Sequence, residues 1–286
     1  MPLRMDFPMT TFVQSRRRFG FCLLALLASG CGYEEYNRRL GETAQYFAYQ
    51  EKMNTNLAVP TRELPIEEIR LPIQFSPLPK PKPPAKSADS TVSEEVPFDP
   101  RQPNFINATL PGLVAAWQAP VDTLVDGKSA VRPGYIFAVS NYWMFTTGQA
   151  ELAPLFTRDI RRLAAANFID PRNPVQKDPD GMGDRESFPR AAKYTPPVPY
   201  DVTRFNPEQP INDVRYTVEL FSHRSGDIQV VLIVVLPRDA DVQRAKLNER
   251  IPLMLETLKV SNKKPVAPPK KVGGAAAAPA QPAAGF

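Results

Sequence analysis

Proline is the residue that most limits what this chain can fold into, and it gathers in three stretches of the sequence. The chain has 33 prolines among 286 residues, about twice the usual share of roughly 5%. Because proline fixes φ and has no backbone amide to donate, these stretches are expected to stay outside helices and sheet interiors. We therefore expect residues 60–103 to form a proline-rich linker, residues 170–210 a long loop within a domain, and residues 261–286 a disordered tail.

The small numbers of cysteine and histidine, together with the charge distribution, narrow the possible functions. There are two cysteines and one histidine, which excludes sites built on a histidine pair and disulfide-dense scaffolds. The net charge of +5 belongs to the two ends, because residues 1–30 carry +3 and residues 261–286 carry +4, which leaves the rest at −2. Without a basic stripe along any expected helix, nucleic acid is not an expected partner. We expect no cofactor.

The N-terminus has the features of an export signal. Arg16, Arg17 and Arg18 precede an apolar run of ten residues, Phe19–Ala28, which is too short to span a bilayer and typical of a signal peptide over residues 1–30. The run ends in the residues Leu-Ala-Ser-Gly before Cys31. An ordinary signal, cleaved near Gly30 with Cys31 left as a plain thiol, would show the same pattern. The segment from Ser15 to Phe19 also has a twin-arginine pattern, so the export route stays open.

This cleavage region resembles the lipobox of bacterial lipoproteins, although Ala28 stands where leucine is commonest in that family. The resemblance implies that Cys31 is the lipidated first residue of the mature chain. It also implies a protein of the cell envelope, anchored by its lipid to a membrane on the exported side. Because Cys22 lies within the signal, the mature chain is then expected to have neither a free thiol nor a disulfide.

Residues 31–59 are expected to form an anchored helical segment. Within residues 33–53, apolar side chains recur at steps of three and four, which is the period of one helix face. They are Tyr33, Tyr36, Leu40, Ala44 and Phe47. Three roles are open for this face: contact with lipid headgroups, docking on the domain, or pairing with a partner helix.

Residues 104–260 are expected to form one α+β domain, a small antiparallel sheet flanked by helices. Apolar runs on both sides of Asp126-Gly127 indicate a hairpin, and residues 149–167 have the strongest helical pattern. Residues 214–220 alternate as in a half-buried strand, and the uninterrupted apolar run 230–236 indicates a central strand buried on both faces. A last helix, containing Pro252, is expected over Asp239–Val260.

The order of these elements, and the closing string from Ile251 to Val260, resemble the PsbP-like fold. That resemblance implies an antiparallel sheet flanked by helices, in proteins that bind partners or small ligands and are not enzymes. No site residue carries over from it, and the proline-rich stretch 170–210 departs from the pattern.

Three groups of residues are candidates for chemistry. Asp178, Asp180 and Asp184 resemble an oxygen-rich calcium loop, although Met182 and Pro189 stand where an EF-hand needs ligands. Aromatic residues could line a ligand or partner site or fill the core; the candidates are Trp117, Tyr142 and Trp143. His223 could act as a general base with Asp227 nearby, but no nucleophile can be placed beside it from the sequence.

Taken together, these patterns favour a membrane-anchored, non-enzymatic binding or scaffold module of the bacterial cell envelope, with an envelope protein as a possible partner. A small-ligand or calcium-binding domain is the alternative, and a hydrolase is a more distant one.

Overall fold

The computed structural model of this chain describes residues 12–81, 99–106, 108–125, 128–168, 183–240 and 245–265, with side chains from residue 33 onward and without the side chain of Val125. The chain divides into two compact units, Met1–Thr55 and Asn56–Phe286. The first contains most of the helix α1, Phe12–Asn56. The second is an α+β domain, as the sequence predicts. Within the described residues, no helix combines the length and the hydropathy that crossing a bilayer requires.

The domain is built on a seven-stranded antiparallel sheet. Its spatial order is β3 (Ser76–Pro77), β4 (Leu113–Val125), β5 (Lys128–Ser140), β9 (Ile228–Pro237), β8 (Tyr216–Ser225), β7 (Val198–Phe205) and β6 (Asp184–Phe188). The antiparallel pair β4–β5 confirms the expected hairpin. Residues 126–127 lie outside the described residues. The run 230–236 is confirmed as a central strand, because β9 is the fourth of the seven strands and is buried along nearly its whole length.

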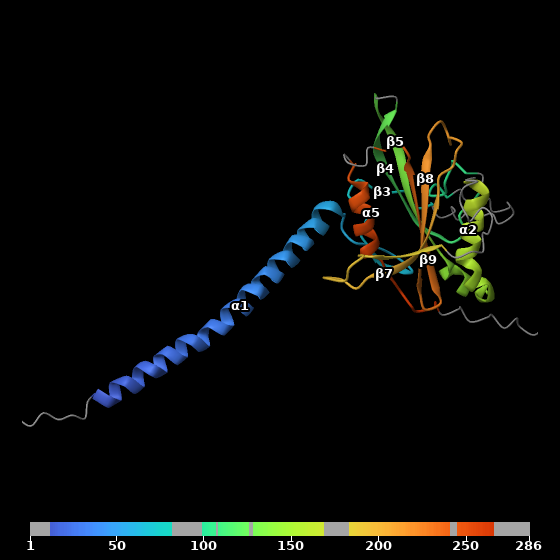
Figure 1. Ribbon diagram of the computed structural model, residues 1–286. Helices are drawn as coiled ribbons and strands as arrows, with labels where there is room; N and C mark the ends of the chain where they lie inside the picture. The colour runs from blue at the N-terminus through green and yellow to red at the C-terminus, as the bar shows by residue number, and fades with distance from the viewer. Residues whose placement is uncertain are drawn as a thin grey trace, which may run out of the picture. The chain divides into compact units, whose positions relative to one another are not determined.

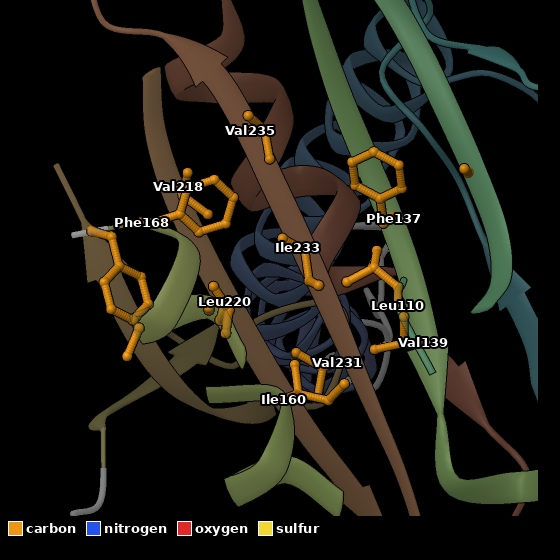
Figure 2. Close-up of a cluster of buried hydrophobic side chains, with 14 of the residues drawn as sticks. Leu110, Phe137, Val139, Ile160, Phe168, Val218, Leu220, Val231, Ile233 and Val235 are labelled. Carbon is orange, nitrogen blue, oxygen red and sulfur yellow. The ribbon is translucent and has the colours of Figure 1, made fainter. Parts of the chain in front are cut away.

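One face of the sheet packs against the helix α2 (Phe156–Asn167). Figure 2 shows this core: alternate residues of three neighbouring strands point at Ile160 and at Phe168, which follows the helix. The strand residues include Phe137 and Val139 of β5, Val231, Ile233 and Val235 of β9, and Val218 and Leu220 of β8. Two short 3₁₀ helices, η1 (Asn141–Phe145) and η2 (Ala150–Leu155), lead from β5 into α2.

The opposite face lies under the helix α5 (Leu247–Glu256), so that the two helices stand on the two sides of the sheet (Figure 1). The intervening β9 residues Val230, Leu232 and Val234 are also fully buried, which shows that this face too is covered. Tyr200 of β7 reaches α5 directly, because its hydroxyl donates to the Leu255 carbonyl at 2.7 Å. Burial raises the pKa of Tyr200 well above the ordinary value of tyrosine.

The expectation of a linker over residues 60–103 is wrong for its first part. A second, three-stranded sheet is formed by β1 (Thr61–Glu63), β2 (Ile66–Ile69) and β10 (Lys259–Val260). Side chains of this stretch enter the core; they are Ile66, Ile69, Leu71 and Phe75. The strands of this sheet are two to four residues long, and Pro60 and Pro65 stand outside them, where no ladder hydrogen bond is lost. Pro77 lies in β3, at the edge of the large sheet. Residues 82–98 lie outside the described residues.

The expectation of a long loop over residues 170–210 is also wrong in part, because β6 and β7 form there and complete one side of the sheet. Residues 169–182 lie outside the described residues. The helix expected over Asp239–Val260 is shorter than expected: α5 ends at Glu256 and the chain then forms β10. The tail beyond residue 265 is likewise not described.

Candidate functional site: a charged pocket at the end of the sheet

The aromatic residues proposed from the sequence are placed in different surroundings. Trp117 is only 3% exposed and pairs with Ile136 across the β4–β5 ladder, so it belongs to the core. Tyr142 and Trp143 are half-buried in η1. The indole Nε1 of Trp143 is buried without a hydrogen-bond partner among the described residues. These three aromatic residues do not form one site, and none of them lines the charged pocket described below.

The carboxylates proposed for calcium are only partly described. Asp178 and Asp180 lie outside the described residues, and Asp184 is the exposed first residue of β6. Within the described part of the chain, no three His, Cys, Asp or Glu side chains are close enough to hold a metal ion. Cys31 lies in α1, and its side chain is outside the described set.

His223 and Asp227 do not form a catalytic pair. His223 lies on β8, and its Nδ1 is 2.9 Å from the carbonyl oxygen of Pro199. Asp227 instead pairs with Lys264, whose Nζ is 2.6 Å from the carboxylate. The hydrogen bond from Lys264 is the main reason that the pKa of Asp227 is lowered. The histidine is thus held by a backbone group of β7 rather than by an acid.

A pocket of about 370 Å³ with several charged lining residues lies at one end of the large sheet; we call it the charged pocket. It is lined by Thr123, Arg132, Pro210, Asp213, Val214, Arg215, Pro237 and Asp239. Two arginines and two aspartates therefore face one space. Unlike the arginines and acids that pair elsewhere in the domain, none of these four side chains forms an ion pair or hydrogen bond with another described residue.

A two-residue turn sets one wall of the charged pocket. Ile211 and Val214 exchange both backbone hydrogen bonds, at 2.8 and 3.0 Å, and the central residues Asn212 and Asp213 have φ values of 48° and 62°. Both central residues are thus left-handed, as in a type I′ turn, a conformation that asparagine and aspartate tolerate better than other side-chain-bearing residues. The turn places Asp213 just before Arg215, whose carbonyl accepts from the Arg238 amide at 2.6 Å.

The end of the β4–β5 hairpin forms another wall. The β5–β9 ladder stops at Tyr135, and beyond it the hairpin is bonded instead to the chain that follows β9. The Leu124 amide donates to the carbonyl of Asp239 at 3.0 Å, and the Thr123 hydroxyl donates to the Ala130 carbonyl at 2.9 Å. These bonds bring Arg132 and Asp239, which are far apart in sequence, to the same pocket.

Two tyrosines on the α2 side of the sheet, Tyr135 and Tyr216, lie near the end of the sheet that holds the charged pocket. Burial raises the pKa of Tyr216 to about 12; the neighbouring Tyr135 adds to the rise, and the positive charge of Arg132 opposes it. Burial also raises the pKa of Tyr135. The ring of Phe105 lies over both, with centroids 5.0 Å from Tyr135 and 6.0 Å from Tyr216. Both tyrosines are therefore neutral hydrogen-bonding groups at neutral pH.

Two aliphatic side chains on the outer face of the hairpin end are exposed. Leu124 is 54% and Val131 62% exposed, and both alternate with the residues that face the charged pocket. Arg132 and Val131 also line a second, open pocket of about 470 Å³ beside β3. Arginine is enriched in protein-binding surfaces, and apolar side chains beside it would add to such a surface. We call Leu124, Val131 and Arg132 together the hairpin-end surface.

By contrast, the apolar space under residues 103–110 is filled. The cavity there has a volume of about 10 Å³, at the lower limit for a single water molecule. Its lining is entirely apolar and includes Phe105, Leu110, Phe137 and Phe168. This part of the α2 side is a packed core and leaves no room for a ligand.

Sequence reasoning did not find the charged pocket. Its four charged residues span positions 132 to 239 and belong to three different turns or strand ends, so no local spacing links them. One local signal was present: Asn212-Asp213 stands between Ile211 and Val214, and this pattern is typical of a two-residue turn. No protein-family model matches the chain, and no curated protein is significantly similar to it.

Proposed function

We propose that this protein is a membrane-tethered, non-enzymatic binding module of the bacterial cell envelope, and that it engages an envelope protein through the charged pocket and the hairpin-end surface. The observation that carries the proposal is a set of four charged side chains that line one pocket and have no ion-pair partner among the described residues: Arg132, Asp213, Arg215 and Asp239. Unpaired charges of both signs favour a partner with complementary charges of both signs, as a polypeptide surface offers.

The tether is supported by the sequence. Arg16 to Arg18, the ten-residue apolar run and the Leu-Ala-Ser-Gly residues before Cys31 have the order that lipidation requires. Two or more acyl chains on one cysteine would hold the protein at a membrane without a spanning segment. Mass spectrometry of the intact N-terminal peptide tests this: an acylated Cys31 is expected, and a free thiol in the exported protein would contradict it.

The binding experiment uses the full chain in its native membranes. Proteins chemically cross-linked to the wild type are compared with those captured by Arg132→Glu/Arg215→Glu. The control is Arg62→Glu/Arg190→Glu, which makes the same charge change at two exposed arginines outside the charged pocket. A partner held by the wild type and by the control should be lost from the pocket variant, and raising the salt concentration should weaken the wild-type complex because charged contacts are screened.

Thermal unfolding of both variants checks that the domain stays folded. If the folded pocket variant captures the same proteins as the wild type, the charged pocket is not the binding site. If the wild type captures nothing above background, the protein-binding function itself is wrong.

A further inference from the structure

The helix α1 presents an apolar stripe that the charged pocket does not explain. Tyr33, Tyr36, Leu40 and Phe47 are 68%, 62%, 54% and 64% exposed. At 3.6 residues per turn they fall, with Ala44 between the last two, within an arc of about 80°. The stripe begins two residues after Cys31 and runs for four turns.

The other side of the same turns carries charges that satisfy one another. Arg38 contacts both Glu35 and Glu42 at 2.7 Å, and Arg39 contacts Glu35 at 2.7 Å. The hydrogen bonds from Arg38 and Arg39 lower the pKa of Glu35. The two arginines and two glutamates of this network balance in charge, and Tyr46, which is 43% exposed, lies among them. The network therefore needs no charged partner and is suited to face water.

The size and composition of the stripe favour a lipid surface over a second copy of the chain. Four side chains with these exposures offer on the order of 500 Å², whereas a stable interface needs about 800 Å² from each partner. In a heptad starting at Tyr33, the positions that would continue a helix–helix seam hold Thr43 and Gln50. Tyrosine, with an apolar ring and a polar hydroxyl, is enriched where hydrocarbon meets water.

We propose that residues 33–47 of α1 lie in the membrane–water interface, with Tyr33, Tyr36, Leu40 and Phe47 toward the acyl chains and the Arg38 network toward water. This inference rests on the proposed lipid tether, because a stripe of this size binds a membrane well only when an anchor already holds it there. The helix would fix the direction in which the chain leaves the membrane.

The experiment places a photo-cross-linking amino acid, p-benzoylphenylalanine, at single positions of the full chain in native membranes. Tyr36 and Leu40 test the stripe, and Glu42 and Gln45 serve as matched controls on the charged side. We expect phospholipid adducts when the probe stands at position 36 or 40, and no such adducts when it stands at position 42 or 45.

Three results would overturn the inference. An adduct of twice the chain mass from the stripe positions would show a second copy on the stripe, and an intrachain cross-link to residues 104–260 would show that the stripe docks on the domain. Lipid adducts of equal yield from both sides of the helix would show that the stripe does not face the membrane in preference to the charged side. Membrane fractionation separates these three results from failure of the tether. A membrane-bound, acylated chain without stripe adducts contradicts only this inference. A chain in the soluble fraction contradicts the tether as well.

Discussion

At position 112 the backbone has no room for a side chain. Gly112 has a φ of +64°, and a Cβ built there would lie 2.2 Å from the Ser140 carbonyl oxygen and 2.5 Å from the indole nitrogen of Trp143. The Gly112 carbonyl also accepts from the Ser140 amide at 2.9 Å. Gly112 therefore allows β4 to begin directly against the end of β5 and under the Trp143 ring.

Gly112→Ala is expected to lower the free energy of unfolding by about 1–3 kcal/mol, because the left-handed backbone is strained for alanine and its methyl group meets a backbone oxygen. The control is Gly41→Ala in α1, where a Cβ meets nothing within 4 Å and a small gain in helix stability is expected. Chemical denaturation of both variants measures the difference. Equal unfolding midpoints for Gly112→Ala and the wild type would show that the start of β4 can move aside.

At the scale of elements, one arginine joins three strands at the β6 side of the sheet. Arg204 on β7 donates from Nη2 to Glu186 on β6 at 2.6 Å and from Nε to Glu219 on β8 at 2.8 Å. Burial would lower the pKa of Arg204, but the two carboxylates outweigh it and raise the value. The three side chains thus bind β6, the last strand in the order of the sheet, to the rest of the sheet.

Arg204→Met is expected to lower the free energy of unfolding by about 1–2 kcal/mol, since the two glutamates lose their hydrogen bonds and are left facing each other while partly exposed. The matched control is Arg185→Met: that side chain is 80% exposed and 3.7 Å from Asp201, so a change of only a few tenths of a kcal/mol is expected. Urea titration followed by circular dichroism compares them. A loss no greater than that of the control would show that Arg204 is not needed to hold the β6 edge.

The elements that could be predicted from the sequence are those whose side chains follow one period over a long stretch. The alternation of β8 and the apolar run of β9 are of this kind, and the structure confirms both. Short edge strands such as β2 and β6 give too few residues to show a period, and nearby prolines concealed them. The charged pocket could not be predicted from the sequence. It depends on where the β5–β9 ladder ends and on the hydrogen bond that Leu124 then forms with Asp239, in the segment after β9.

Proline also proved compatible with long strands where its missing amide has no neighbour. Pro120 and Pro133 lie opposite each other in the β4–β5 ladder. On the outer side of β4 the β3 ladder covers only Trp117 and Gln118, and on the outer side of β5 the β9 ladder stops at Tyr135. Because both prolines lie beyond the neighbouring ladders, an amide facing outward there would have no ladder partner among the described strands, and its loss costs no bond in them.

At the scale of the whole molecule, the domain depends on a segment that precedes six of the seven strands of its main sheet in sequence. The Arg70 backbone amide donates to Thr257 Oγ1 at 2.9 Å, and the Ser261 amide donates to the carbonyl of Pro65 at 3.0 Å. The guanidinium of Arg250 on α5 donates to Gln74 Oε1 at 2.7 Å. Residues 61–77 are therefore part of the folded domain on its α5 side and are not a linker that precedes it.

A chain that begins at residue 104 is therefore expected not to fold, whereas one that begins at residue 33 is expected to fold. The shorter chain lacks four buried side chains, Ile66, Ile69, Leu71 and Phe75, each contributing about 1.5–3 kcal/mol. Their sum is comparable with the whole stability of a typical domain, about 5–15 kcal/mol, and their loss also exposes the apolar residues of α5. Thermal denaturation and limited proteolysis of both chains measure the effect. A cooperative transition at the same temperature in the shorter chain would show that the other six strands of the large sheet are stable without the segment, and would return residues 60–81 to the role of a spacer.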